Sequence, residues 1–146
     1  MKLLIQRVTE AEVLVAERSI NKIGQGFLIF VGVEEEDCGV NKAPGVAKKV
    51  SEMRVFSDPN GKMNLSIKDI EGEVLLISQF TLCANLERGR RPDFIKAAPP
   101  NIAMEMYEEL AKELIKLGVP TKLGSFGDTM QVKLTNDGPA TFILER

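Results

Sequence analysis

The chain has 146 residues and no histidine. A chain without histidine cannot build the Ser-His-Asp or Cys-His systems that activate a nucleophile, nor a histidine-rich zinc site. Cysteine is also scarce, because Cys38 and Cys83 are the only two. Two widely spaced cysteines provide neither a disulfide framework nor a structural zinc site, and they are typical of a reducing compartment. We therefore expect a cytoplasmic protein that needs no metal and no cofactor.

Long apolar runs and a strong excess of one charge are absent too. The opening segment MKLLIQRV has only three consecutive apolar residues before Gln6, which is too short for the core of a signal peptide. No other stretch approaches transmembrane length, so we expect no membrane partner. The net charge of −2 indicates that any contact with a polyanion must come from a local patch. The length predicts a single domain, residues 1–146.

The chain does contain a strand-rich pattern with two helices. Alternating or continuous apolar residues predict strands over residues 2–8, 11–17, 27–33 and 73–78, the first two joined as a hairpin through Thr9-Glu10. A turn region is expected over residues 19–26, and a helix over residues 43–53. The clearest helix covers residues 101–118, where Leu110 and Leu114 share an apolar face and Gly118 ends it. The predicted fold class is α+β, with a curved, mostly antiparallel or mixed sheet and two main helices.

The C-terminal segment MQVKLTNDGPATFILE predicts two strands joined by a turn. Alternation runs from Met130 to Leu134 and resumes at Phe142. Asn-Asp-Gly alone makes an ordinary tight turn, but Pro139 donates no hydrogen bond and disturbs the start of the next strand. Either this turn is wider than usual, or it presents its backbone to another molecule. On the residues alone the ordinary turn is favoured, because proline is common in loops.

A second candidate site follows the buried strand at residues 73–78. Its apolar run ends abruptly in Ser78, Gln79, Phe80 and Thr81. Polar side chains at the end of a central strand need partners, which are either neighbouring backbone groups or a ligand. The residues alone favour backbone partners. Cys83 is a weak candidate nucleophile, because no histidine can activate it.

A long irregular stretch, CANLERGRRPDFIKAAPP, places Arg88, Arg90 and Arg91 close together. Loops of this length in a single domain are more often functional than idle. The three arginines form either a solvated basic loop or a clamp for phosphate groups, to which guanidinium forks are well suited. The sequence does not favour one interpretation over the other.

Five segments of the chain resemble motifs of the D-aminoacyl-tRNA deacylases, in the order and at the chain length of that family. They are QRV (6–8), GKMNLS (61–66), SQFTL (78–82), GSFGDTM (124–130) and NDGPAT (136–141). The resemblance implies a barrel-like α+β domain that forms a homodimer with its active sites at the subunit interface. It also implies a hydrolase that cleaves the ester of D-aminoacyl-tRNA, and of glycyl-tRNA on a non-cognate tRNA, as translation quality control. The expected partner is aminoacylated tRNA through its 3′-terminal adenosine, and no DNA is expected.

The same resemblance assigns roles to particular residues. It implies a cis Gly138-Pro139 bond in a turn that enters the partner subunit's pocket, where the two carbonyls exclude an L side chain by leaving it no room. Arg7 is expected to support this turn, and Phe126 and Met130 are expected to line the pocket for the terminal adenosine. Ala140 and Asp128 depart from the usual family pattern, which has valine and a small residue there.

For catalysis, the resemblance makes the missing histidine informative. An aminoacyl ester is already reactive, and the 2′-hydroxyl of the tRNA can assist its cleavage. The protein then needs only to hold the ester and stabilise the oxyanion, with backbone N–H groups of Phe80 and Thr81 as donors beside Ser78 and Gln79. Thr81 as a covalent nucleophile ranks second. Two other functions remain open, a non-catalytic RNA-binding dimer and a small-molecule esterase.

Overall fold

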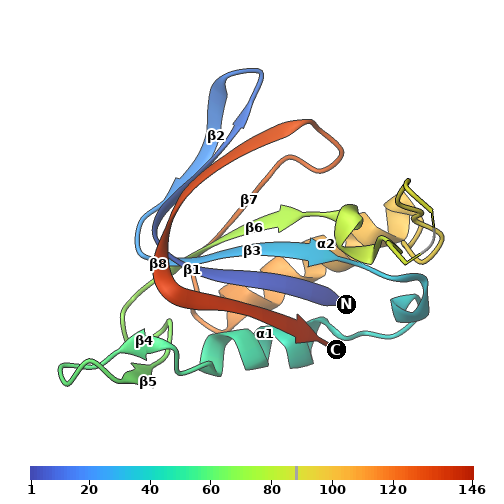
Figure 1. Ribbon diagram of the computed structural model, residues 1–146. Helices are drawn as coiled ribbons and strands as arrows, with labels where there is room; N and C mark the ends of the chain where they lie inside the picture. Colours follow the sequence, from blue (N-terminus) through green and yellow to red (C-terminus); the bar gives the residue numbers. More distant parts are fainter. Residues whose placement is uncertain (88) are drawn as a thin grey trace.

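Six strands form one curved, mixed sheet in the computed structural model of the protein, which describes residues 1–87 and 89–146 (Figure 1). The strands are β1 (Lys2–Val15), β2 (Arg18–Ile23), β3 (Gly26–Gly32), β6 (Glu73–Ser78), β7 (Thr121–Leu123) and β8 (Met130–Glu145). Their order is β2-β1-β3-β6-β7, and β8 pairs with the other edge of β1. The pairs made by β1 are antiparallel, whereas β3, β6 and β7 run parallel to one another.

Two helices, α1 (Ala43–Glu52) and α2 (Pro100–Lys116), cover one face of this sheet (Figure 1). Short 3-10 turns, η1 (Glu35–Asp37) and η2 (Phe80–Cys83), follow β3 and β6, and a small separate sheet pairs β4 (Phe56–Ser57) with β5 (Met63–Leu65). Gly118, with a positive φ, ends α2 as expected, and the N–H of Val119 closes the last turn on the carbonyl of Leu114. Both predicted helices are confirmed within a few residues.

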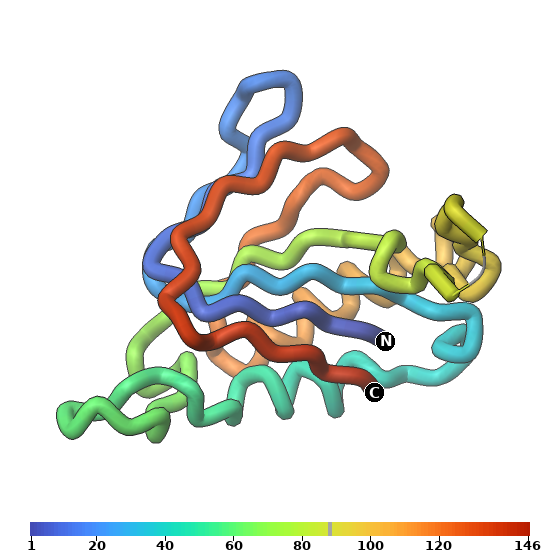
Figure 2. The backbone as a smooth tube through the Cα atoms, viewed as in Figure 1, coloured from blue at the N-terminus to red at the C-terminus, as the bar shows by residue number. Residues whose placement is uncertain are grey.

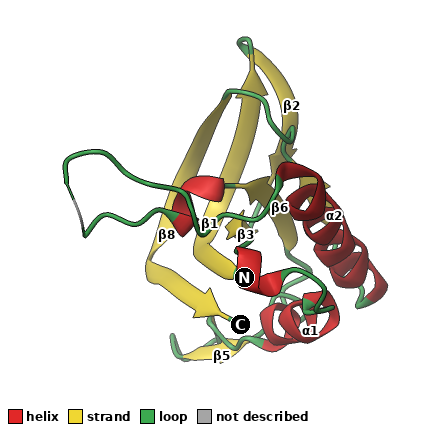
Figure 3. Cartoon of the chain, turned by 90° about the vertical axis from the view of Figure 1, so that its right-hand side faces the viewer, coloured by secondary structure: helices red, strands yellow, loops and turns green. Residues whose placement is uncertain are grey.

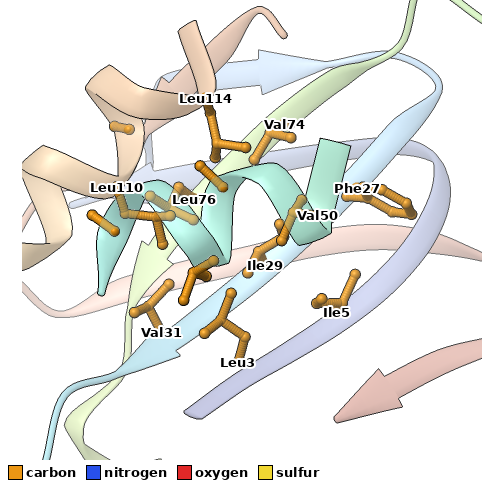
Figure 4. Close-up of a cluster of buried hydrophobic side chains, with 14 of the residues drawn as sticks. Leu3, Ile5, Phe27, Ile29, Val31, Val50, Val74, Leu76, Leu110 and Leu114 are labelled. Atoms are coloured by element: carbon orange, nitrogen blue, oxygen red, sulfur yellow. The ribbon is translucent and has the colours of Figure 1, made fainter. Parts of the chain in front are cut away.

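The main core lies between the helices and the sheet. Alternate residues of the central strands, such as Ile29 of β3 and Leu76 of β6, point toward Val50 of α1 and toward Leu110 and Leu114 of α2 (Figure 4). The residues between them, Leu28, Leu75 and Ile77, belong to a second buried cluster on the opposite face. The central strands are therefore buried on both faces, as their continuous apolar runs predicted.

The sheet is nearly closed into a barrel at the edge where β2 approaches β7. The side-chain amide of Asn21 donates to the carbonyl of Leu123 at 2.7 Å, and the Lys122 ammonium donates to the carbonyl of Lys22 at 2.7 Å. Side chains thus bridge these two strands where a backbone ladder would otherwise close the barrel. The α+β, barrel-like prediction is confirmed. No helix within the described ranges is long and apolar enough to span a membrane.

Both predicted hairpins are wrong. Strand β1 bends but does not reverse at Thr9 and Glu10, and β8 continues from Met130 to Glu145 along the same partner (Figure 2). Gln6 pairs with Thr141 and Val8 pairs with Asn136, so residues 137–140 stand opposite Arg7 alone. We call residues 137–140 the Gly-Pro bulge. Period-2 alternation interrupted by turn residues looks the same in a hairpin and in a bulged strand, which explains the error.

The predicted turn over residues 19–26 is also wrong, because β2 occupies most of it. The true hairpin connection is Ala16-Glu17, where both residues have positive φ (48° and 64°). Two-residue hairpin turns of this kind usually contain glycine or asparagine. Neither residue is present at these two positions, so the local sequence gave no indication of the turn.

Candidate active site

A cavity of about 770 Å³ opens beside the carboxyl ends of the parallel strands β3 and β6 and the start of α2. Crevices outside the carboxyl ends of parallel strands are common ligand sites, and this volume is typical of small-molecule pockets. Its lining includes Val31, Ile77, Ser78, Gln79, Phe80, Phe94, Ile95, Pro99, Ala103, Tyr107, Phe126, Asp128, Met130 and Val132. Five residues predicted for the site, Ser78, Gln79, Phe80, Phe126 and Met130, thus meet in one cavity.

The Ser78–Thr81 segment turns sharply at the end of β6. The N–H of Gln79 donates to the carbonyl of Val31 at 2.7 Å, and the chain then leaves the sheet into η2. Gly32 of β3 lets η2 approach closely, since a Cβ there would lie 3.0 Å from both Cys83 Sγ and Leu82 Cβ. This packing fixes the turn against the sheet and holds its backbone at the cavity.

Two amide groups of this turn have no hydrogen-bond partner in the part of the chain that the structure describes. Among the hydrogen bonds of the described residues, the N–H groups of Phe80 and Thr81 donate to none, whereas those of Leu82 and Ala84 bond back to Gln79 and Thr81. The first N–H groups of a helical turn lack internal acceptors. Phe80 and Thr81 therefore offer two adjacent donors to a bound molecule.

Thr81 is poorly placed to act as a nucleophile. Its side chain is exposed to solvent. Its hydroxyl accepts a hydrogen bond from the side-chain amide of Gln79, and an amide N–H cannot take up a proton. Cys83 is unsuitable as well, because burial raises the pKa of its thiol and Sγ donates to the carbonyl of Val33.

Tyr107 of α2 forms part of the inner wall, and the sequence analysis did not identify it. Its hydroxyl donates to the carbonyl of Leu76 at 2.7 Å, and burial raises its pKa, so the group stays protonated. Its ring lies 6.0 Å from that of Phe126, centroid to centroid. The only signal for it in the sequence was a lone tyrosine on the apolar side of the predicted helix. Asp128 also lines the cavity, and its carboxylate accepts a hydrogen bond from the Ser125 hydroxyl.

The Gly-Pro bulge lies apart from this cavity. Gly138 and Pro139 are exposed, their peptide bond is cis, and neither belongs to the described lining of the cavity. Arg7 is only 4% exposed and contacts the buried side of the bulge. Its Nε lies 3.1 Å from the carbonyl of Asp137 and 2.9 Å from Asp137 Oδ2.

Further contacts anchor the bulge on both sides. A second nitrogen of Arg7 donates to the carbonyl of Val55, and the Asn136 amide donates to the carbonyl of Arg7 at 3.1 Å. Ala140, buried, completes its base. The bulge therefore exposes its backbone while several hydrogen bonds fix its conformation. It does not line the cavity of its own protomer.

The arginine-rich stretch projects from the body of the protein as a long loop after η2 (Figure 3). Arg90 and Arg91 are exposed on it, and Arg88 lies outside the described residues. Within residues 1–87 and 89–146, no three His, Cys, Asp or Glu side chains are grouped so that they could hold a metal ion.

Comparisons with known proteins agree with these motifs. A family model described as D-Tyr-tRNA(Tyr) deacylase matches residues 4–145. The chain belongs to this deacylase family. A D-aminoacyl-tRNA deacylase of Protochlamydia amoebophila is 47% identical over 145 residues, covering 99% of this chain and 95% of that protein. One of Haemophilus influenzae is 49% identical over 141 residues, covering 97% and 96%.

Among solved structures, one described as the c-Myc DNA unwinding element binding protein has a TM-score of 0.92 and 38% identity, covering 100% of this chain and 99% of that one. The deacylase family resemblance, first drawn from short motifs, extends over residues 4–145 in the family model and over 99% of the chain in the first of these relatives. In this member of the deacylase family the SQFTL and GSFGDTM segments meet at the cavity, and the NDGPAT segment forms the separate bulge.

Proposed function

We propose that this chain is a D-aminoacyl-tRNA deacylase. It hydrolyses the ester between a D-amino acid and the 3′-terminal adenosine of tRNA and releases the free amino acid and the tRNA. The observation that carries this proposal is a pair of amide donors, Phe80 and Thr81, that have no partner among the described residues and lie beside a cavity large enough for a nucleoside, in a chain of the deacylase family.

The terminal adenosine occupies the cavity in this proposal. Phe126 and Met130 provide apolar and aromatic surface for the base, and Ser78 and Gln79 provide polar groups for the ribose. The ester carbonyl then lies against η2, where the amides of Phe80 and Thr81 stabilise the oxyanion that forms when water attacks. The C–O3′ bond breaks, and the neighbouring 2′-hydroxyl assists this step, so that no side-chain base is required.

Selection against L-amino acids is assigned to the Gly-Pro bulge of a second copy of the chain. The bulge is exposed, and Arg7 holds its backbone through Asp137. A segment that restricts space in another subunit's site must be both accessible and rigid. Backbone carbonyls of Gly138 and Pro139 fill the space that an L side chain needs, whereas a D side chain points elsewhere. Glycine has no side chain to exclude, so glycyl-tRNA is also a substrate.

A homodimer is required for this arrangement, and one part of the sheet face opposite the helices offers a surface for it. Ile143 of β8, Leu4 of β1 and Phe30 of β3 are neighbours in register, and they alternate with residues that face the helices. Ile143 is 74% exposed and lies at the β8 end of this apolar row. We assign the contact with a second copy to this row, because exposed apolar side chains favour burial at an interface.

Contacts to the rest of the tRNA are assigned to the loop after η2. Arg90 and Arg91 are exposed there and suit phosphate oxygens, and Arg88 is assigned to the same role from the sequence alone. Because the substrate is a component of translation, the enzyme is expected to act in the cytoplasm.

The test is the deacylation of matched substrates. Purified protein is incubated with D-Tyr-tRNA and with L-Tyr-tRNA, and the ester that survives is measured by acid precipitation of the labelled amino acid. The D ester should be lost while the L ester persists. Equal rates on both esters would contradict chiral selection. Binding of tRNA without release of amino acid would favour the RNA-binding alternative, and turnover of simple esters without RNA would favour the esterase.

A further inference from the structure

Two phenylalanines at the mouth of the cavity are unusually exposed. Phe80 of η2 is 58% exposed and Phe94 of the following loop is 36% exposed, yet both contribute to the cavity lining. Their ring centroids lie 5.0 Å apart at an interplanar angle of 63°. The two rings therefore support each other in an edge-to-face pair, and the pair keeps aromatic surface in contact with solvent.

The backbone holds Phe94 in place although it lies in a loop. Asn85 and Asp93 exchange hydrogen bonds of 2.9 and 3.2 Å across the base of the loop. After Phe94, the N–H of Ala97 donates to the carbonyl of Phe94 at 2.9 Å, and the N–H of Ala98 donates to the carbonyl of Val33 at 3.0 Å. The position of the ring is thus fixed before any ligand binds, which lowers the entropic cost of using it as a contact surface.

We infer that Phe80 and Phe94 form a stacking platform for the nucleotide next to the terminal adenosine of the tRNA. This inference rests on the proposed function. If the terminal adenosine fills the cavity, an RNA strand that leaves it past the exposed lining residues Phe80 and Phe94 meets both rings. Single-stranded RNA is commonly bound by stacking its bases on exposed aromatic rings beside a basic groove.

Charges near the platform agree with an RNA strand. Arg90 and Arg91 precede Phe94 in the same loop, and Lys96 follows it. Asp93 is the acidic residue next to Phe94 in sequence, and its Oδ1 accepts the N–H of Ile95 at 3.4 Å. Glu35 and Asp128 also line the cavity, so the basic residues of the loop lie beside a few acidic ones. Stacking needs only an aromatic face, so this platform accepts any base at that position and adds affinity without sequence preference.

The experiment compares two substrates on one variant. The substrates are D-Tyr-tRNA and the minimal ester 3′-O-D-tyrosyl adenosine, which lacks the neighbouring nucleotide. For Phe94→Leu, which keeps apolar volume and removes the ring, the ratio of kcat/KM on tRNA to kcat/KM on the minimal ester should fall about tenfold, through KM. Phe94→Tyr should restore the ratio. Leu86→Ala is the matched control, because Leu86 is 72% exposed in the same loop and does not line the cavity.

A spectroscopic measurement keeps the test independent of activity. Deacylated tRNA that carries 2-aminopurine next to its terminal adenosine should lose fluorescence on binding the wild-type protein, and Phe94→Leu should abolish that quenching. Wild-type binding without quenching would overturn the inference, as would an unchanged substrate ratio in Phe94→Leu.

Two other outcomes distinguish the stacking platform from a contact between copies and from the proposed function. If Phe94→Leu instead changes the oligomeric state in sedimentation, the rings belong to a contact between copies, and the platform is rejected. If the wild-type protein cleaves neither ester, the proposed function fails, while quenching would still report stacked RNA.

Discussion

Replacing Gly138 with alanine separates the folding of the Gly-Pro bulge from its function. A Cβ at Gly138 would meet only Asn136 Oδ1, at 3.5 Å, which is an ordinary van der Waals contact. The φ of Gly138 is not positive, so an L residue is tolerated there. No described residue of the protomer therefore requires glycine at this position, and we expect Gly138→Ala to fold normally.

The expected stability change is small and favourable. Gly→Ala at a tolerant position raises the free energy of unfolding by about 0.4–1 kcal/mol, because the unfolded chain loses freedom. For a domain of this size that corresponds to a rise in Tm of about 1–4 °C. The added methyl should, however, displace the substrate's α-carbon from the wall, and a displacement near 1 Å can cost about 100-fold in rate. We therefore expect kcat/KM on D-Tyr-tRNA to fall by about that factor.

The assay pairs single-turnover deacylation with thermal unfolding of the same preparation. Gly45→Ala is the control, since Gly45 lies exposed in α1 with nothing within 4 Å of a built Cβ. That change should raise the unfolding free energy by about 1 kcal/mol and leave the deacylation rate unaltered. Wild-type deacylation by Gly138→Ala would refute the assignment of the bulge to the active site. A Tm lowered by many degrees would show that the glycine has a structural role.

Three more predictions follow from other contacts. Arg7→Met should lower the free energy of unfolding in urea by about 1–3 kcal/mol and slow deacylation, because the Asp137 carboxylate loses its cation and the Asp137 carbonyl loses a donor. Unchanged values would show that the bulge keeps its conformation without Arg7. Thr81→Val should keep kcat within about tenfold, since its hydroxyl only accepts from Gln79, whereas complete loss with tRNA binding retained would indicate a nucleophile. Burial acts to raise the pKa of Asp37, but hydrogen bonds from Lys42, the Met1 ammonium and the Glu34 N–H outweigh it, and its pKa is lowered. The stabilising contribution of Asp37 is present at pH values above its pKa in the unfolded chain, about 3.9, and is lost as the pH falls through its lower pKa in the folded protein. In Asp37→Asn, the free energy of unfolding measured with urea should therefore fall less steeply below about pH 4. An unchanged slope would contradict this.

The sequence predicted what depends on local chemistry. Strand β6 was placed at its observed bounds, Glu73–Ser78, because its apolar run ends in polar residues, and α2 was found from its apolar face and the glycine that ends it. The residues Ser78, Gln79, Phe126 and Met130, named in the sequence analysis, line one cavity, and their roles stay predictions. In each case the informative residues lie within one segment or one motif.

What the sequence did not predict depends on partners distant along the chain. The bulge was taken for a hairpin, because alternation does not say that both halves of β8 pair with the same strand, β1. Tyr107 and Phe94 were missed because neither belongs to a recognised motif, and their roles arise only where α2 and the loop after η2 meet at the cavity. Such contacts are set by tertiary packing, which single-sequence patterns do not encode.

The central claim is that the bulge of one subunit completes the cavity of the other, and mixed dimers test it most directly. Ser78→Tyr, designed to block the cavity, and Gly138→Ala, designed to disable the bulge, are each purified, checked for folding and shown to be inactive. They are then unfolded, mixed in equal amounts and refolded together. Only a mixed dimer pairs an intact cavity with an intact bulge, at one of its two sites, so random mixing should recover about a quarter of wild-type activity on D-Tyr-tRNA. Confirmed mixed dimers that remain inactive would contradict the account.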